Sequence, residues 1–415
     1  MVKTMTKIVI IADDMTGALD SGVKLAAQGV SSAAIIDREF DIASFDVTAL
    51  IINTESRHVS AEEAYSRVFV AAKKAYSSGA DIIYKKLDST LRGNIGAELQ
   101  AASDACEKRH IVLAPALPQS GRQTIGGVHF VDGVPLAKTD FAADPLNPIT
   151  TSDVAQIIGM QSQIALRHVP VGGDISYEAG AISLCDASTD DDLHKIALGA
   201  GTNIPAGSAG LAAFLPQMLD MKEAAPPPCE YSAPMLFMVG SVNGAAFAQT
   251  DFAIKNGVSN HSFSLEEMLS ETVSDAAVDK AIAELKSGKP FLIRSTESKS
   301  TLSGLINGAE NLGVSKDSLA EKVGRAFGHA ALKITKALPS ITLVIFGGDT
   351  LLSVMRALDI VELRPKSELF PGTVLSTALS WLKNISIISK AGGFGSDDII
   401  IKLINGGNTA KEESK

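Results

Sequence analysis

The sequence is poor in the residues that build disulfide frameworks and zinc sites. It contains 3 cysteines in 415 residues, and Cys106, Cys185 and Cys229 lie far apart without CxxC spacing. Neither a disulfide framework nor a structural zinc site is therefore expected. The 7 histidines show no HxxH or HExxH spacing, so the sequence gives no support for a dedicated transition-metal centre.

Long apolar runs and an excess of basic residues are also absent. No apolar stretch approaches the ~20 residues that a membrane-spanning helix needs, and the apolar run before Asp13 is too short for a signal peptide. We therefore expect a cytoplasmic protein that has no membrane partner. The formal net charge of -10 argues against a nucleic-acid partner, because such surfaces usually carry a basic stripe. An anionic ligand would need a local basic pocket.

The composition that remains is typical of a globular α/β protein. Hydrophobic residues make up 46% of the chain and aromatic residues 5%, which favours small aliphatic side chains packed between helices and sheets. Apolar runs alternate with amphipathic segments in both halves, as in parallel sheets covered by helices. A proline-rich stretch from Lys222 to Pro234 predicts a linker over 226–234.

These features predict two α/β domains with mainly parallel sheets flanked by helices and an active-site cleft between them. The N-terminal domain is expected over 1–225 and the C-terminal domain over 235–415. No internal repeat of fixed period is visible.

The first motif, IADDMTGALD, places Asp13 and Asp14 where a buried strand turns into a helix. Ligands of open α/β sheets bind at the carboxyl ends of strands. Paired carboxylates there can bind substrate hydroxyls, accept a proton or hold Mg²⁺. The alternative is that Asp14 only caps the helix.

The second motif, YKKLDSTLRGNIG, follows another strand and is dense in polar residues. Cations beside hydroxyls and a carboxylate suit recognition of a carboxylate-bearing polyol; the alternative is a solvated loop with a surface Asp–Arg pair. Two further loops, NTESRH and PALPQSGRQTIGG, also follow strands and could equally be ordinary polar loops. The polar residues of these three loops are Lys85, Lys86, Asp88, Ser89, Thr90, Arg92, Asn94, Arg57, Gln119, Ser120 and Arg122.

The second half contains three glycine-centred segments: VGSVNG around Ser241, FGGDT at Phe346–Thr350, and SKAGGFG at Ser389–Gly395. Glycine lets backbone amides approach phosphate oxygens, and a helix N-terminus adds favourable partial charge. Each segment alone could be an ordinary turn. None matches the Walker pattern GxxxxGK[ST].

A hydroxyl-binding half joined to a phosphate-binding half indicates a kinase, in which Mg²⁺ usually helps to neutralise the phosphates. A dehydrogenase would need GxGxxG at the first strand-to-helix turn, where this chain reads ADDMTG. A non-catalytic sugar-acid sensor would usually carry a basic DNA-binding helix, and none is apparent.

The order of these motifs from Asp13 to Phe394 resembles the four-carbon acid sugar kinase family. The resemblance implies ATP-dependent phosphorylation of the terminal (4-)hydroxyl of a four-carbon acid, D-threonate or D-erythronate, with 3-oxo-tetronate as the alternative. It implies that the N-terminal domain binds the sugar acid and that the C-terminal domain binds ATP. The implied substrate-binding residues are Asp14, Arg57, Lys86, Asp88, Ser89 and Arg122, and the implied nucleotide-binding residues are Ser241, Gly347, Gly348, Asp349, Thr350 and Gly393.

From their places in the same loops we add Arg92 and Gln119 to the substrate-binding set and Gly392 to the nucleotide-binding set. Asp14 and Asp88 are the two candidate catalytic carboxylates. The sequence assigns no metal ligands, and it leaves open whether the chain forms a homo-oligomer.

Overall fold

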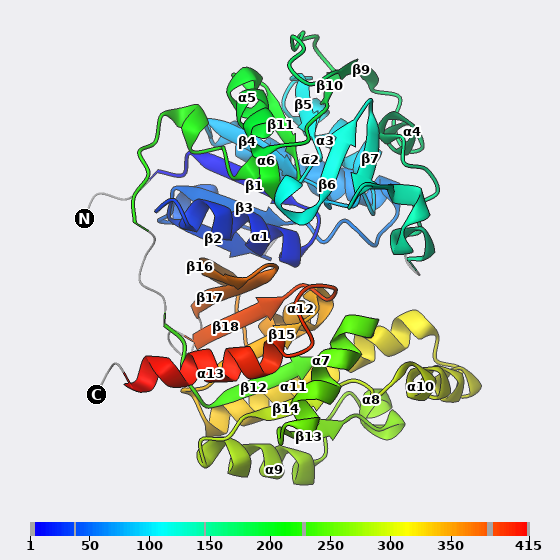
Figure 1. The fold of residues 1–415 in the computed structure, drawn as a ribbon, viewed down its shortest axis with the longest axis vertical. Coiled ribbons are helices and arrows are strands. Elements are labelled where there is room, and N and C mark those ends of the chain that lie inside the picture. Colours follow the sequence, from blue (N-terminus) through cyan, green and yellow to red (C-terminus); the bar gives the residue numbers. More distant parts are fainter. Residues whose placement is uncertain (1–4, 37–38, 145–146, 226–229, 380–384, 413–415) are drawn as a thin grey trace. The chain divides into compact units, whose positions relative to one another are not determined.

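The computed structural model describes residues 5–36, 39–144, 147–225, 230–379 and 385–412 (Figure 1). Packing divides the chain into two compact units, Met1–Pro226 and Pro227–Lys415. Part of the predicted linker, residues 226–229, lies outside the described residues. Cys106 and Cys185 are buried and free, whereas Cys229 also lies outside the described residues.

The first unit is built on a parallel sheet whose central strand is β1 (Ile8–Ala12). The chain returns to the same edge of the sheet after each strand, so Ala12 lies in register with Asn53 on one side and with Lys86 on the other. The loops that follow these strands therefore start side by side. From one edge of the sheet to the other, the strand order is β2 (Ser32–Ile35), β3 (Ala49–Asn53), β1, β4 (Ile82–Lys86), β11 (Ile204–Gly207), β5 (Ile111–Ala114), β10 (Ala181–Cys185) and β9 (Ala165–Val169).

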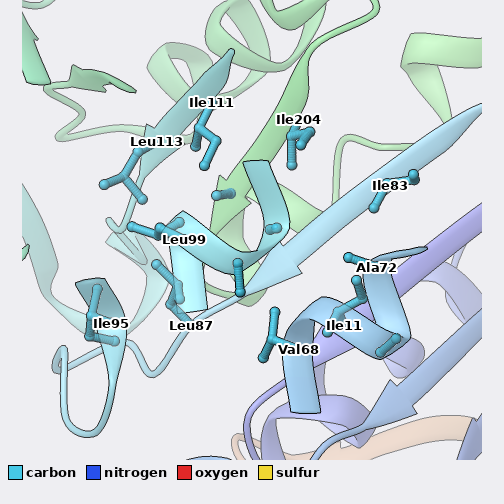
Figure 2. Packing of buried hydrophobic residues seen from close by; sticks show 14 of the residues in the cluster. Ile11, Val68, Ala72, Ile83, Leu87, Ile95, Leu99, Ile111, Leu113 and Ile204 are labelled. Carbon is cyan, nitrogen blue, oxygen red and sulfur yellow. The ribbon is translucent and has the colours of Figure 1, made fainter. Parts of the chain in front are cut away.

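Helices cover both faces of this sheet, which explains why its central strands read as continuous apolar runs. On one face, α2 (Ala61–Ser77) and α3 (Ile95–Ala105) form the main core. Figure 2 shows this core, in which side chains such as Ile11, Val68 and Leu99 come from β1, α2 and α3. The remaining helices of this unit are α1 (Met15–Ala26), α4 (Val154–Gly159), α5 (Asp190–Ala200) and α6 (Ala209–Ala212).

A small antiparallel sheet follows β5 and was not predicted. Its strands are β6 (Arg122–Ile125), β7 (Val128–Val131) and β8 (Val134–Pro135). The turn between β6 and β7 contains Gly126 and Gly127, both with positive φ, as a tight hairpin requires.

The second unit is a mixed sheet with helices on both faces. Strands β13, β14, β12, β15 and β18 run parallel to their neighbours in that series, whereas β17 pairs antiparallel with β16 and β18. Figure 1 shows α7 and α13 on one face and α11 and α12 on the other. The strand order is β13 (Ser259–Ser262), β14 (Phe291–Arg294), β12 (Met235–Val239), β15 (Thr342–Phe346), β18 (Ile385–Lys390), β17 (Thr373–Leu379) and β16 (Glu362–Phe370).

The helices of the second unit are α7 (Gly244–Lys255), α8 (Leu265–Ser270), α9 (Asp275–Lys286), α10 (Lys299–Asn311), α11 (Lys316–Ala337), α12 (Gly348–Ala357) and α13 (Ile399–Glu412). No helix within the described ranges is long and apolar enough to cross a membrane. The prediction of two α/β domains with mainly parallel sheets flanked by helices is confirmed. The antiparallel hairpin of β16 and β17 was not predicted.

The core in Figure 2 predicts that Leu99→Ala is strongly destabilising. Leu99 on α3 is 0% exposed, and removing a fully buried leucine side chain costs about 2–5 kcal/mol because a cavity remains. Leu198→Ala is the matched control, since Leu198 also lies on a helix but is 52% exposed. Urea denaturation should show the loss for Leu99→Ala and a change within about 0.5 kcal/mol for Leu198→Ala. Equal losses would contradict this placement of the core.

Candidate active site

Two aspartates stand where β1 ends and α1 begins. Asp14 caps the helix, since its Oδ1 accepts a hydrogen bond of 2.7 Å from the amide of Gly17. Asp13 is almost completely buried, at 1% exposure. Its Oδ1 has no hydrogen-bond partner among the residues that the structure describes. Helix capping therefore occupies one carboxylate oxygen of Asp14, and it involves neither carboxylate oxygen of Asp13.

Arg57, in the loop after β3, joins these aspartates to the loop after β4. Its Nε lies 2.7 Å from Asp13 Oδ2 and its Nη1 lies 2.6 Å from Asp14 Oδ2. Its Nη2 lies 3.6 Å from Asp88 Oδ1. One buried guanidinium thus holds carboxylates from two separate strand ends. Gly93 permits this packing, because its φ is +92° and a Cβ there would lie 3.0 Å from Arg57 Cγ.

Asp88 is held more tightly than a surface ion pair would be. It is 7% exposed, and Arg92 grips it with Nε at 2.8 Å from Oδ2 and Nη2 at 3.1 Å from Oδ1. The hydroxyl of Thr90 also donates to Oδ2, at 2.5 Å. Burial raises the pKa of Asp88, but the charges of Arg92 and Arg57 outweigh it and hold the pKa well below the usual range.

Asp13 and Asp14 differ from each other in their electrostatics. Burial raises the pKa of both carboxyls. At Asp13 the charges of Arg57, Lys85 and Lys86 more than offset burial, so its pKa is lowered. At Asp14 burial and the negative charge of Asp13 together outweigh Arg57, so its pKa is raised. Asp14 is thus the better proton acceptor of the two.

Lys85 and Lys86, the two lysines that end β4, have different partners. Lys85 is fully buried and its Nζ lies 2.7 Å from Glu98 Oε2, on α3. Glu98 also accepts a hydrogen bond of 2.6 Å from Ser56 Oγ, the residue before Arg57. This pair therefore anchors the loop that carries Arg57. It was not predicted, although a lysine inside an apolar strand and a glutamate on the apolar face of a helix are a sequence signal for a buried ion pair.

Lys86 points toward the start of α1. Its Nζ donates to the carbonyl of Leu87 at 2.7 Å, and a Cβ at Gly17 would lie 2.8 Å from that Nζ and 2.8 Å from Asp14 Oδ1. Glycine at position 17 therefore allows an ammonium and a carboxylate to approach the same helix terminus.

The remaining predicted substrate residues are only partly brought together. The Ser89 carbonyl accepts a hydrogen bond of 2.9 Å from His129 Nε2, so β7 supports that loop. Burial lowers the pKa of His129 to about 4, which keeps the ring neutral. Arg122 lies close enough to Asp88 for the two charges to interact. Gln119 instead donates to Asp190 Oδ2 at 2.9 Å, on the exposed side of α5.

In the second unit, the three glycine segments meet at one sheet edge. Val239, Phe346 and Lys390 end neighbouring strands in register. A Cβ at Gly240 would lie 2.0 Å from Thr350 Oγ1, which shows how closely the first two loops pack. A Cβ at Gly392 would lie 2.8 Å from Ser241 Oγ, so the third loop packs against the first.

The start of α12 has the features of an anion site. Gly347 precedes it with φ +104°, and no side chain caps the helix, so its first amides remain available to a ligand. The start of α7 differs, because Asn243 accepts there from the amide of Ala246. Asp349 is exposed, and its carboxylate has no partner in the described part of the chain.

The side chains of the described residues form no cluster of three or more metal-ligating groups. Mg²⁺ in kinase sites is usually held by one or two carboxylates together with phosphate oxygens. The exposed carboxylate of Asp349 beside the start of α12 fits that requirement.

Two family models match the chain, one in each half. A family model described as a sugar-binding N-terminal domain matches residues 8–215, and one described as a nucleotide-binding C-terminal domain matches residues 236–400. A D-threonate kinase of Salmonella typhimurium is 33% identical and the match covers 95% of this chain and 96% of the relative. A D-erythronate kinase of Heliobacterium modesticaldum is 30% identical, with 95% of each chain covered.

A crystal structure of a Haemophilus influenzae protein from a family described as a domain of unknown function has the same fold. It covers 96% of this chain and 100% of its own, with a TM-score of 0.73 at 19% identity. The two domain models and the full-length relatives together show that the chain belongs to the four-carbon acid sugar kinase family.

Proposed function

We propose that the protein transfers the γ-phosphoryl group of ATP to the terminal (4-)hydroxyl of D-threonate or D-erythronate. The observation that carries this proposal is the buried network in which Arg57 holds Asp13, Asp14 and Asp88 together at one sheet edge. Such a network offers oxygen acceptors to the hydroxyls of a polyol. The match of the chain to 96% of a D-threonate kinase and 95% of a D-erythronate kinase supports the choice of acid.

The acid's own carboxylate needs a cation. Arg57 already serves three carboxylates, so we assign this role to Lys86. Arg122, whose charge interacts with that of Asp88, would add positive charge nearby. An ammonium has three donors, and Lys86 uses one of them on the Leu87 carbonyl. These local cations would offset the net charge of -10, which otherwise repels an anion.

We assign the proton-accepting role to Asp14. As the new bond to phosphorus forms and ADP leaves, the attacking hydroxyl must release its proton, and a positioned carboxylate can accept it. The raised pKa of Asp14 suits that role. The low pKa and the tight Arg92 contacts of Asp88 suit a residue that orients the acid and stays charged.

The nucleotide is assigned to the second unit, with Ser241, Thr350, Gly392 and Gly393 around it and the start of α12 facing its phosphates. Mg²⁺ would be held by Asp349 together with phosphate oxygens, and it would neutralise charge that builds up on the phosphates.

The reaction is tested by an ATP-consumption screen with Mg²⁺ on D-threonate, D-erythronate, their L-enantiomers and 3-oxo-tetronate. ADP formation with a D-tetronate supports the proposal. Turnover of 3-oxo-tetronate alone would move the substrate to the alternative acid. NAD(P)H formation on the same panel without ATP consumption would identify a dehydrogenase instead, and binding without turnover of any kind would identify a sensor.

A pair of matched variants distinguishes the proposed roles of Asp14 and Asp88. Asp14→Asn should lower kcat by about 10²–10⁴-fold with a smaller effect on the KM of the acid, since it removes the proton acceptor. Asp88→Asn should chiefly raise the KM of the acid, by about tenfold, because it releases Arg92 and removes a charged acceptor for the hydroxyls of the acid. Steady-state kinetics measure both. Near-normal kcat in both variants would mean that positioning and charge neutralisation alone drive transfer.

The nucleotide site predicts a selective effect of Gly347→Ala. At φ +104° an alanine is strained by about 1–3 kcal/mol, so relaxation of the loop should weaken ATP binding by about 5- to 100-fold. Binding of the acid should be unchanged. Gly304→Ala is the control, because Gly304 lies in α10 with open space at its Cβ position. Calorimetric titration measures the affinity of each variant for ATP and for the acid. An unchanged ATP affinity in Gly347→Ala would show that this loop is not part of the nucleotide site.

A further inference from the structure

Lys390 lies in the segment SKAGGFG, but neither the sequence analysis nor the proposed reaction gives this buried lysine a role. It is the last residue of β18 and is 2% exposed. Its Nζ donates to three carbonyls of the following loop, those of Ala391 at 3.0 Å, Gly392 at 3.1 Å and Phe394 at 2.7 Å. No carboxylate among the described residues forms an ion pair with it. Among the described residues, its positive charge interacts with backbone oxygens and with the ring of Phe346, whose centroid lies 4.5 Å away.

This arrangement determines where the amides of the loop point. In each peptide unit the C=O of one residue and the N–H of the next face in opposite directions. Because the carbonyls of Ala391, Gly392 and Phe394 turn toward Nζ, the amides of Gly392, Gly393 and Gly395 turn away from it. Within the described ranges none of these three amides donates a hydrogen bond. The amides of Gly392 and Gly393 are consecutive, and successive outward-facing amides of this kind form an anion-binding concavity.

Contacts with the neighbouring loops fix this loop in place. Phe346, which lies against the ammonium, directly precedes Gly347 and the start of α12. Gly392 packs against the side chains of Ser241 and Asn243, in the loop after β12. On the other side, Gln249 Nε2 donates to the carbonyls of Phe394 at 3.0 Å and Gly395 at 2.9 Å. Lys390 thus contacts two glycine loops directly and reaches the third through Gly392.

We propose that Lys390 is a positioning residue that holds the loop Ala391–Gly395 as an anion-binding nest for the phosphates of the nucleotide. This inference rests on the proposed nucleotide site. Lys390 acts through the backbone carbonyls that it holds, and it also places a positive charge beneath the amides that would face the phosphates.

The cost of burying this charge distinguishes the role from simple packing. Burial lowers the pKa of Lys390 to about 8, and no charged side chain of the described residues is among the causes of that shift. Since the pKa falls on folding, the ammonium opposes folding below about pH 8, and stability rises as the pH increases from there toward the usual lysine value. A methionine of similar length should therefore be tolerated, because Ala391, Gly392 and Phe394 are only partly buried and their carbonyls can turn to water.

The test compares Lys390→Met with Lys336→Met, which removes an exposed lysine of α11. Lys390→Met should raise the Kd of ATP about tenfold or more, leave the KM of the acid unchanged and not lower the melting temperature at pH 7. In the unmodified protein, the Kd of ATP should rise between pH 7.5 and about 9.5 as the ammonium loses its proton. Lys390→Met should remove that pH dependence, and Lys336→Met should preserve it.

Two results would overturn the inference: an unchanged Kd for ATP in Lys390→Met, or a lowered melting temperature with equal losses of ATP and acid binding, which is the signature of a structural role. Should Lys390→Met fail to fold, the pH profile of the unmodified protein decides, and a flat Kd contradicts the inference. If Gly347→Ala weakens ATP binding while Lys390→Met does not, this inference alone fails. If the unmodified protein binds no ATP, the proposed function fails with it.

Discussion

Arg57 makes the cluster of Asp13, Asp14 and Asp88 in the first unit possible, because three carboxylates cannot be buried close together without a cation among them. Its guanidinium contacts Asp13 and Asp14 directly and reaches Asp88 at 3.6 Å. Removing that one side chain would leave negative charges from two strand ends facing one another. The residues around Arg57 serve this contact: Gly93 gives it space, and the buried Lys85–Glu98 pair anchors Ser56 beside it.

The second unit must supply positive charge to a ligand instead of neutralising its own carboxylates, since the nucleotide proposed for it is negatively charged. There the favourable charge comes mostly from the backbone: an uncapped helix start after Gly347 and a loop whose carbonyls are turned inward by Lys390. Close packing makes this possible, because Gly240 and Gly392 have neighbours that a Cβ would overlap. Glycines at these positions are thus explained by contacts between loops as well as by access to phosphate.

Much of the fold was predictable, because buried strands and amphipathic helices leave a periodic signal; the buried strand predicted before Asp13, for example, is β1, Ile8–Ala12. The loops that gather at each sheet edge were also predictable, because parallel strands bring their carboxyl ends together. Most contacts between residues far apart in the sequence were not predictable. Motif position could not show that Gln119 bonds to Asp190 on α5 or that His129 supports Ser89. The ion pair of Lys85 and Glu98 left a signal in the sequence, but the motifs did not pair the two residues.

The different pKa values of the carboxyls were not predictable from the sequence either. Asp14 and Asp88 both follow a strand end, so the sequence made them equal candidates for the catalytic carboxylate. What separates them is the number of cations and donors around each. Asp88 meets Arg92, Arg57 and the Thr90 hydroxyl, all of which favour its charged form. Asp14 forms an ion pair with Nη1 of Arg57 and accepts a hydrogen bond from the amide of Gly17. The neighbouring negative charge of Asp13 disfavours its charged form. Pairs of acids whose pKa values are driven apart in this way are characteristic of sites where one group stays charged and another moves a proton. Asp13 fits the first role and Asp14 the second, because Arg57, Lys85 and Lys86 keep Asp13 charged, and that charge in turn raises the pKa of Asp14.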